Sequence, residues 1–500
     1  MMRRGSGVLL HISSLPGPYG VGCFGREVLD FARILSEAGV SYWQVLPFSV
    51  PGEGDSPYMS VSAFAGNPML IDPEELVDRG WITSGELSEL ESTGDALAAD
   101  FDHCRKKRSV LLRKAYQRIP ATTRKAIEEF TDEREWVQDL ALFLMLRAMN
   151  GGSPWWEWKD EDLRRHDPYS LAAIRDRYRE EYLFYAFVQY LFFTQWSALK
   201  TQINALGISV IGDIPIYVSR DSVDVWAHRP LFQIDERLNF LNVAGVPPDY
   251  FSEKGQLWGN PLYNWAAHAD EDYRWWRSRL SNNFGLYDLL RIDHFRGFSS
   301  YWSVESDRKD AIVGTWEKGP GQAFFDRLQL DFPEAPIFAE DLGEATEDLQ
   351  NFLDSTGFPG MRVFQFGFDD EEDNKHRPHN YSRSCVAYSG THDNDTSLGW
   401  YSGLPEDSVQ TLRAYCGLDL RETEPDKPEA ICKGIIRSVM QSHADLVIFP
   451  VQDILYMDSS RRMNIPGTQT GNWGVRFLRE ELARADLKWL MRMNRLTGRI

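Results

Sequence analysis

Acidic residues and histidines, with Arg291 among them, gather in four short segments of the chain, each at the end of a run of apolar residues. These segments are IGDIPIYV with Asp213, LLRIDHFRG with Arg291, Asp293 and His294, FAEDLG with Glu340 and Asp341, and SGTHDND with His392, Asp393 and Asp395. A single acid at the end of a strand is usually a helix cap or a surface ion pair. Four such clusters in consecutive order instead predict one chemical site.

Converging carboxylates without a metal-binding pattern favour glycosyl transfer. One carboxylate attacks the anomeric carbon of a sugar, and a protonated partner donates its proton to the leaving oxygen. Arg291 lies two residues before Asp293, so both side chains point the same way from a strand and the guanidinium is expected to keep that carboxylate ionised. Glu340 follows the apolar IFA, where burial is expected to raise its pKa toward that of a general acid.

Two other kinds of site are less well supported. A metal site would combine the same histidines and acids, but the chain has no H-x-x-x-H pair or carboxylate triplet with ligand spacing. GVGCFG at residues 20–25 matches G-x-G-x-x-G, yet its first glycine does not directly follow a strand, and the next strand ends in QVLP without an acid. We therefore predict neither a metal nor a cofactor.

Eight short runs rich in β-branched and aromatic residues are predicted to be the strands that position these clusters. They are residues 8–11, 42–47, 208–213, 287–293, 337–340, 361–366, 385–389 and 446–450. Amphipathic helical patterns lie between most of them, for example at residues 24–38, 182–206, 321–330 and 347–354. Strands that alternate with helices predict parallel crossovers, and eight strands favour a closed (β/α)8 TIM barrel whose strand ends meet at one mouth.

The spacing of the eight runs is uneven. Residues 48–207 separate the second run from the third, far more than a loop between a strand and a helix needs. We predict one catalytic barrel over residues 1–500 with large, mainly helical insertions. These are a helical subdomain at about 51–180, a loop region at 218–279 and a helical insertion at 397–444.

Composition narrows the functional class. Hydrophobic residues make up 43% and charged residues 26% of the 500 residues, as in ordinary globular proteins. The formal net charge of -20 disfavours nucleic acid and anionic lipid as partners. The longest apolar stretch, residues 182–193, is too short to span a membrane, and the N-terminus has no signal-peptide core. Five cysteines without a C-x-x-C pair favour a reducing, cytoplasmic location.

Long motifs throughout the chain resemble those of the 4-alpha-glucanotransferases of glycoside hydrolase family 77. They include SSLPGPYGVG, GDSPYMSVSAFAGNP, IGDIPIYV, AGVPPDYFSEKGQLWGNPLYNW, LRIDHFRGF, FAEDLG, SGTHDNDT and RMNIPGTQTGNW. The resemblance implies a retaining enzyme that acts on α-1,4-glucans and maltooligosaccharides without a cofactor, and it implies that the loop region at 218–279 binds the glucan. Glu53 precedes GDSPY where members of the family can carry an aromatic residue, so an accessory glucan groove on that side is not predicted. The sequence does not determine the oligomeric state, and a monomer is compatible with it.

The resemblance also implies roles for individual residues. Asp293 is the expected nucleophile, Glu340 the general acid and base, and Asp393 a third carboxylate that steadies the distorted sugar. The expected substrate-binding residues are Tyr58, Asp213, Asp249, Gln256, Trp258, Arg291, His294, His392 and Asn464. Residues 249–258 resemble a mobile loop that closes over the glucan, with Gly255 as a hinge; Trp258 is either a stacking platform or a hydrophobic anchor.

A retaining mechanism makes a geometric prediction and leaves two alternatives. The carboxyl groups of Asp293 and Glu340 are expected about 5 to 5.5 Å apart, because the nucleophile must touch the anomeric carbon. An α-amylase-type hydrolase would share both chemical steps and differ only in admitting water as the acceptor. A non-catalytic glucan-binding protein would keep the aromatic residues but would not need both carboxyl groups on adjacent strands.

Overall fold

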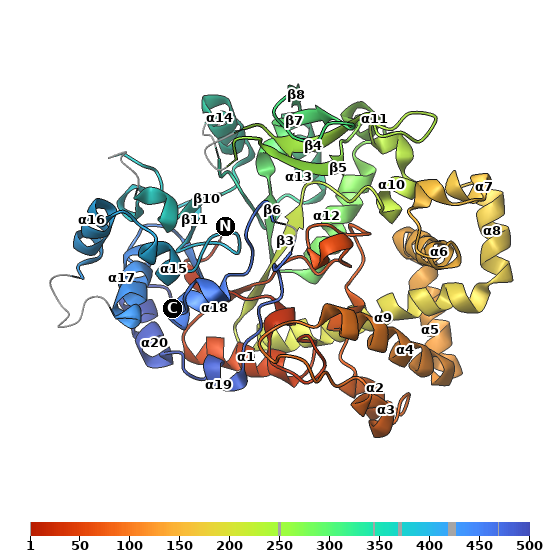
Figure 1. Cartoon of the computed structure of the whole chain (residues 1–500), viewed down its shortest axis with the longest axis horizontal. Helices are drawn as coiled ribbons and strands as arrows, with labels where there is room; N and C mark the ends of the chain where they lie inside the picture. The colour runs from red at the N-terminus through yellow and green to blue at the C-terminus, as the bar shows by residue number, and fades with distance from the viewer. Residues whose placement is uncertain (1, 249–251, 344–345, 369–372, 419–426, 469) are drawn as a thin grey trace.

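The centre of the molecule is a sheet of eight parallel strands in the order β10-β11-β12-β1-β2-β3-β6-β9. The computed structural model describes residues 2–248, 252–343, 346–368, 373–418, 427–468 and 470–500 (Figure 1). The eight strands are β1 (Gly5–Leu9), β2 (Tyr42–Gln44), β3 (Ser209–Pro215), β6 (Leu289–Asp293), β9 (Ile337–Ala339), β10 (Gly360–Val363), β11 (Cys385–Tyr388) and β12 (Leu446–Pro450). They correspond to the eight predicted runs, so the predicted barrel is confirmed, with strand ends displaced by a few residues.

The barrel closes between β9 and β10. The amide of Ala339 donates to the carbonyl of Pro359 at 2.8 Å, and the carboxylate of Asp341 accepts a hydrogen bond from the amide of Met361 at 2.6 Å. A Cβ atom on Gly360 would lie only 2.8 Å from that carboxylate, so glycine is needed for this approach. Asp341, one of the acids at the strand ends, therefore joins the two sides of the closure.

Two apolar layers hold the barrel, one inside it and one outside. Side chains alternate along each strand, so every second residue points into the barrel. The interior cluster includes Leu9, Ile211, Leu289, Phe338, Val386 and Ile448. Residues of opposite parity, such as Val8, Val210 and Leu290, belong to the much larger cluster between the barrel and its helices. Burial on both faces explains why the strands read as continuous apolar runs.

Helices surround the barrel and fill its long connections. Between β1 and β3 lie α1 (Arg26–Glu37), α2 (Glu74–Asp78), α3 (Ser84–Ser88), α4 (Phe101–Arg118), α5 (Ala121–Asp132), α6 (Glu135–Met149), α7 (Glu161–Arg164), α8 (Pro168–Arg177) and α9 (Arg179–Ala205). Further along are α10 (Val223–Ala227), α11 (Trp265–Asp270), α12 (Arg274–Leu286), α13 (Gln322–Asp331), α14 (Glu347–Thr356), α15 (Ser397–Ser402), α16 (Glu406–Cys416), α17 (Pro428–Met440), α18 (Val451–Ile454), α19 (Arg479–Leu482) and α20 (Leu487–Leu496). The orange to yellow helices α4–α8 lie on one side of the barrel and the blue helices α17 and α20 on the other (Figure 1). None of the helices in the described ranges is long and apolar enough to cross a membrane.

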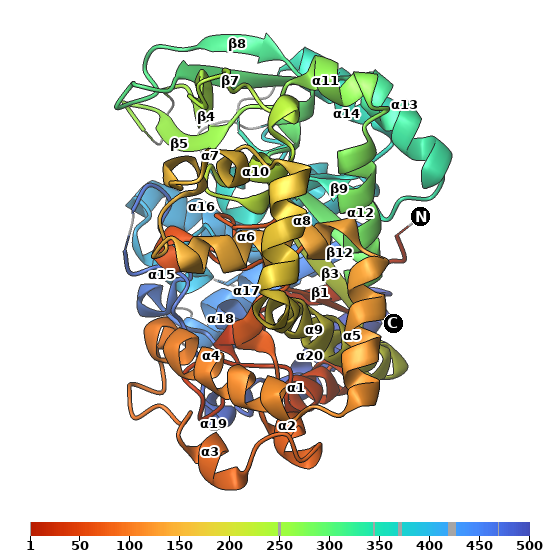
Figure 2. The same ribbon diagram turned by 90° about the vertical axis from the view of Figure 1, so that its right-hand side faces the viewer.

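A second, antiparallel sheet lies beyond one end of the barrel (Figure 2). Its strands are β4 (Asn242–Val246), β5 (Gln256–Pro261), β7 (Ser300–Glu305) and β8 (Thr315–Lys318), in the order β5-β4-β7-β8. Gln256 and Trp258 therefore belong to a paired strand, although a mobile loop was expected there. Asp249 and residues 250–251 lie outside the described residues.

Gly255, expected to be a hinge, instead occupies a tight turn before β5. Its φ is 65°, and a Cβ atom would lie 2.3 Å from the carbonyl oxygen of Val246. The lack of a side chain therefore serves the left-handed backbone and the close approach of β4 to β5.

Candidate active site

Arg291 links two acids at the carboxyl ends of β3 and β6. The parallel register places Asp213 directly beside Arg291, and Asp293 follows two residues later on the same face. Arg291 Nη1 donates to both carboxylate oxygens of Asp213 at 2.8 Å and to Asp293 Oδ1 at 2.9 Å. The side chains of Arg291 and Asp213 are 4% and 0% exposed, whereas that of Asp293 is 28% exposed. Asp293 is thus the member of this group that a ligand can reach.

Glu340, immediately after β9, is held by two backbone amides. The amide of His294 donates to Glu340 Oε2 at 2.7 Å, and the amide of Leu342 donates to Oε1 at 3.0 Å. His294 has a left-handed backbone with φ of 48°, which is unfavourable for a residue with a side chain. This conformation turns the chain sharply after β6 while its amide binds Glu340.

Burial controls the protonation of Glu340 and His294. Burial raises the pKa of Glu340 to about 7; the charge of Asp293 raises it further, while Arg291 and the two amides oppose the rise. A carboxyl group with this pKa exchanges a proton near neutral pH, as a general acid and base must. Burial also lowers the pKa of His294 to about 4, so its imidazole is neutral at pH 7.

Tyr58 connects this group to the opposite side of the barrel mouth. Its hydroxyl donates to Asp213 Oδ2 at 2.8 Å, and its ring stacks on His392 with centroids 5.2 Å apart. His392 Nε2 lies 3.4 Å from Asp393 Oδ2, and Asn464 Nδ2 donates to Asp393 Oδ1 at 2.6 Å. The side chain of Asp393 is 43% exposed, so a second reachable carboxylate faces the mouth.

The segment 391–396, which carries Asp393, is anchored from both ends. The carboxylate of Asp453, buried in α18, accepts hydrogen bonds from the hydroxyl of Ser389 at 2.5 Å and from the amide and hydroxyl of Ser397 at 2.7 Å. Ser389 follows β11 and Ser397 begins α15. One buried carboxylate therefore fixes the two ends of the segment.

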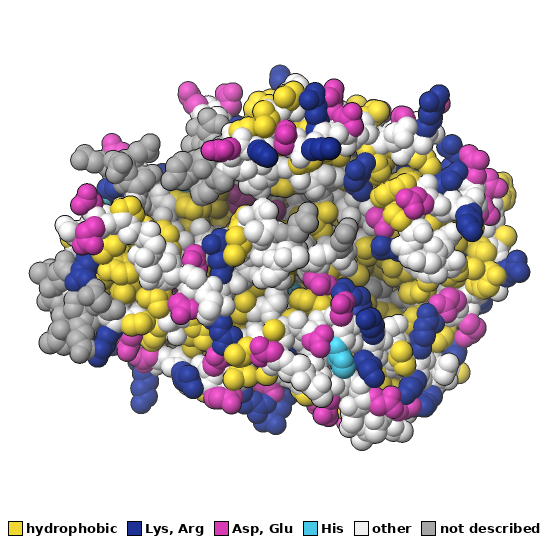
Figure 3. All heavy atoms as spheres, in the orientation of Figure 1, with side chains coloured by type: hydrophobic (Ala, Val, Ile, Leu, Met, Phe, Trp, Pro, Cys, Tyr) yellow, Lys and Arg dark blue, Asp and Glu magenta, His cyan; other side chains and the backbone are white. Residues whose placement is uncertain are grey.

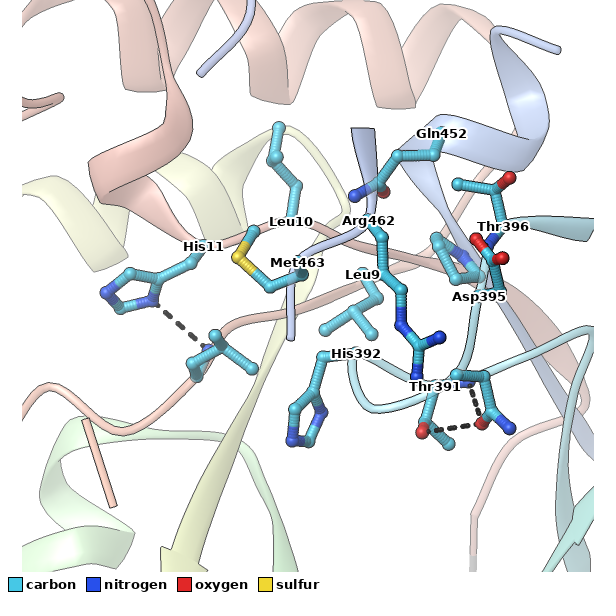
Figure 4. Close-up of a pocket in the computed structure, with 13 residues that line it drawn as sticks. Leu9, Leu10, His11, Thr391, His392, Asp395, Thr396, Gln452, Arg462 and Met463 are labelled. Atoms are coloured by element: carbon cyan, nitrogen blue, oxygen red, sulfur yellow. Dashed lines mark hydrogen bonds between the residues drawn. The ribbon is translucent and has the colours of Figure 1, made fainter. Parts of the chain in front are cut away.

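A pocket lined by both polar and apolar side chains lies beside His392, at the ends of β1, β11 and β12 (Figure 4). Its lining residues include His11, Thr391, His392, Asp395, Gln452, Arg462 and Met463. Arg462 Nη2 donates to the carbonyl of Asp393 at 2.6 Å. The pocket thus borders the segment that carries the second reachable carboxylate.

Aromatic rings border the group on two sides. Trp258 meets the His294 ring nearly perpendicularly, with centroids 4.8 Å apart, and its indole nitrogen donates to Gln256 Oε1 at 3.2 Å. Trp473 packs against Tyr58 and His392, with centroids 5.6 and 6.0 Å apart. Both residues remain partly exposed, so a ligand can contact them.

Contacts join the described site candidates into a network of two groups, which meet at the peptide bond between Asp293 and His294. The first group contains Tyr58, Asp213, Arg291, Asp293, His392, Asp393 and Asn464. The second contains Gln256, Trp258, His294 and Glu340. Sequence reasoning missed Trp473, Arg462 and Asp453. An aromatic residue in GTQTGNW was a signal for the first, but nothing local placed the other two beside the site.

Two adjacent strands of the barrel thus present a reachable, ion-paired carboxylate and a buried carboxyl group of raised pKa. This arrangement indicates an enzyme that cleaves or transfers glycosides. Comparison with known proteins is more specific. Residues 10–481 match the glycoside hydrolase 77 family model, described as 4-alpha-glucanotransferase. The chain therefore belongs to this family.

Individual relatives agree with this assignment. The chain is 45% identical to the 4-alpha-glucanotransferase of Thermus thermophilus over 96% of both chains. It is 39% identical to that of a Streptococcus pneumoniae strain over 100% of this chain and 98% of the relative. Among solved structures, an amylomaltase from Streptococcus agalactiae in complex with acarbose has a TM-score of 0.95 and 37% identity, over 99% of this chain and 100% of that chain.

Proposed function

We propose that the protein transfers a segment of an α-1,4-glucan from a donor to the 4-hydroxyl of an acceptor glucan or glucose, with retention of configuration. The observation that carries this proposal is the contrast between Asp293, which is reachable and ion-paired, and Glu340, which is buried with a pKa near 7. Two carboxyl groups in different environments suit a nucleophile and a general acid. Family membership supports the glucan substrate and favours transfer over hydrolysis.

In the proposed first step, Asp293 attacks the anomeric carbon while Glu340 gives its proton to the departing oxygen, which leaves a covalent glycosyl ester on Asp293. In the second step, Glu340 takes the proton from the acceptor hydroxyl, and that oxygen displaces Asp293. Arg291 orients the nucleophile through its 2.9 Å contact. Asp393 steadies the distorted sugar from the opposite side.

The remaining site candidates have proposed binding roles. Tyr58, His294, His392 and Asn464 surround the attacked glucose, since all belong to the network around the three carboxylates. Asp213, which is buried, supports the substrate site by holding Arg291 and the Tyr58 hydroxyl in place. Gln256 and Trp258 hold the glucan on the β5 side. The resemblance to the family assigns Asp249 a binding role as well. No step requires a cofactor, because the protein's own groups supply nucleophile and proton.

A product analysis distinguishes transfer from hydrolysis. Purified protein is incubated with maltotriose, and the products are resolved by chromatography. Transfer yields glucose together with oligosaccharides longer than maltotriose, whereas an amylase-type hydrolase yields only maltose and glucose. Absence of the longer products would overturn the proposal.

The proposed cellular role is disproportionation of maltooligosaccharides in starch, glycogen or maltodextrin metabolism. A cytoplasmic location is part of this proposal. It is supported by the five cysteines, which are free thiols in the structure, as expected in a reducing compartment.

A further inference from the structure

The four-stranded sheet carries an exposed aromatic pair outside the candidate active site. Trp302 on β7 is paired in register with Trp316 on β8, and their ring centroids lie 5.5 Å apart. The side chain of Trp316 is 42% exposed, and Ile312 and Val313 in the preceding turn are also exposed. We call these four residues the tryptophan patch. Hydrophobic side chains gather at the edge of the molecule over β7 and β8, among charged groups (Figure 3).

The rings of the patch are held in place. The guanidinium of Arg296 lies over the Trp316 ring, 4.5 Å from its centroid. The Trp302 indole nitrogen donates to the carbonyl of Ala311 at 2.9 Å, and a Cβ atom on Gly314 would lie 2.6 Å from that indole. Because the rings are already ordered, a ligand that stacks on them loses little affinity to side-chain ordering.

The tryptophan patch is the solvent-exposed part of one face of the four-stranded sheet, and the rest of the apolar cluster on that face is buried or partly buried. On the same face, Val243, Val304 and Leu257 pack with the buried Ala311. The next pair along β7 and β8 on this face is Ser300 and Lys318. The open surface thus combines two indole rings, inclined at 63° to one another, with a hydroxyl and an ammonium group beside them.

We propose that the tryptophan patch is an accessory binding site for an α-1,4-glucan chain. The proposal rests on the proposed function, which makes such chains the substrate. Indole faces stack on the apolar faces of pyranose rings, while Ser300 and Lys318 offer hydrogen bonds to the sugar hydroxyls. A glucan is uncharged, so Lys318 would contribute a hydrogen bond and not an ion pair.

Continuity with the candidate active site supports this occupant. Trp302 and Leu257 lie on one face of the sheet, so Trp258, the next residue along β5, lies on the other face, where it contacts His294. Arg296, two residues after His294, contacts Trp316 and joins the patch to the site. A polymer bound at the patch would therefore be tethered to the part of the molecule that borders the cleft. Binding at two linked places raises the apparent affinity for long chains without changing that for short ones.

A second copy of the chain is the other occupant to consider, and the size of the patch disfavours it. Stable interfaces bury about 800 Å² per partner. The apolar area here comprises four residues and is followed by exposed charges at Glu305, Arg308 and Lys309. β8 is a short edge strand that ends in Lys318, a residue that discourages pairing between edges.

The test measures binding of polymer separately from turnover of a short substrate. Glu340→Gln serves as the parent for affinity electrophoresis in native gels containing amylopectin, so that the polymer is not consumed. Trp316→Ala in this parent is expected to raise the apparent dissociation constant for amylopectin about fivefold or more. Tyr169→Ala, which removes an exposed aromatic residue from α8, is the matched control and should leave it unchanged.

Single variants in the active protein complete the test. Trp316→Ala is expected to keep kcat/KM for maltotriose within about twofold of the wild type. Trp316→Phe keeps a stacking face and should retain most of the polymer affinity, which separates stacking from any folding defect.

Wild-type polymer affinity in the alanine variant, or equal losses for polymer and maltotriose, would overturn the proposal. A wild-type dimer that Trp316→Ala dissociates in light scattering would overturn it in favour of a second copy. Failure of the proposed function would show separately, as absence of transfer products from wild-type protein.

Discussion

Asp293 and Glu340 carry the same functional group in different surroundings, and that difference determines what each can do. Asp293 is partly exposed and receives a hydrogen bond from Arg291, so its carboxylate is accessible and oriented. Glu340 is buried and receives two backbone hydrogen bonds, while burial raises its pKa to about 7. The environments, more than the residue types, support a nucleophile and a proton donor.

Removing either carboxyl group is predicted to abolish transfer. Asp293→Ala deletes the nucleophile and Glu340→Gln deletes the transferable proton, so each variant should lower turnover of maltotriose by about a thousandfold or more. Product formation is measured beside circular dichroism, which should match the wild type. Near wild-type turnover in either variant would refute that residue's role.

The raised pKa of Glu340 predicts a pH limit on activity. The first step needs the protonated form, so kcat/KM should fall as the pH rises through about 7 and decline about tenfold per pH unit above it. The measurement is kcat/KM for maltotriose between pH 5 and pH 9, with residual activity checked at pH 6 after each incubation. A profile that stays flat to pH 9 would contradict the assignment of Glu340 as the acid.

Among the elements, β5 brings Trp258 to the edge of the site. Pairing of β5 with β4 fixes the backbone of Gln256 and Leu257, while Trp258 contacts the His294 ring. Transfer requires that an acceptor sugar be held in line and that water be kept from the covalent intermediate. A fixed aromatic ring beside the intermediate is suited to both tasks.

We predict that Trp258→Ala lowers transfer more than it lowers donor cleavage. The fraction of cleaved bonds lost to hydrolysis should then rise, because the acceptor is less well positioned and water gains access. New reducing ends and longer oligosaccharides are quantified at one maltotriose concentration. Trp258→Phe, which keeps an aromatic face, is the control. If both activities fall in the same proportion, Trp258 only binds glucan.

At the scale of the whole molecule, the chain ends are tied together beside β1. Arg499 is buried, and its guanidinium donates to the carbonyls of Gly5 at 3.0 Å, Asp445 at 3.2 Å and Met440 at 3.1 Å. These contacts link the first strand of the barrel to the end of α17 and the start of β12. The last residues of the chain therefore hold together the end of the barrel that lies opposite its mouth.

Arg499→Ala is predicted to destabilise the fold without affecting chemistry. Loss of the hydrogen bonds to four backbone carbonyls, those of Gly5, Asp445, Met440 and Ser442, should cost about 2 to 4 kcal/mol and lower the melting temperature by several degrees. Calorimetry measures this change, and kcat/KM for maltotriose at 25 °C should equal that of the wild type. Arg495→Ala, at an exposed position of α20, should leave both unchanged. An unaltered melting temperature in the Arg499 variant would contradict this role.

The positions of the barrel strands and of the main acids could be predicted from the sequence. Buried parallel strands read as short apolar runs, and polar residues such as Asp213 and Glu340 stand out where those runs end. The alternation of side chains along a strand also placed Arg291 and Asp293 on one face. These are local properties, set by residues close to one another in the chain.

The long-range side-chain contacts, the four-stranded sheet and the backbone amides at Glu340 depend on the tertiary structure and could not be predicted from the sequence. The stacking of Tyr58 on His392 and the bond from Asn464 to Asp393 join residues far apart in sequence, and no periodicity encodes such pairs. The four-stranded sheet was missed because β4 contains a glycine and β8 has only four residues, mostly exposed, so neither shows a clear apolar pattern. The backbone amides on Glu340 depend on how two strand ends meet, which packing determines and sequence spacing does not.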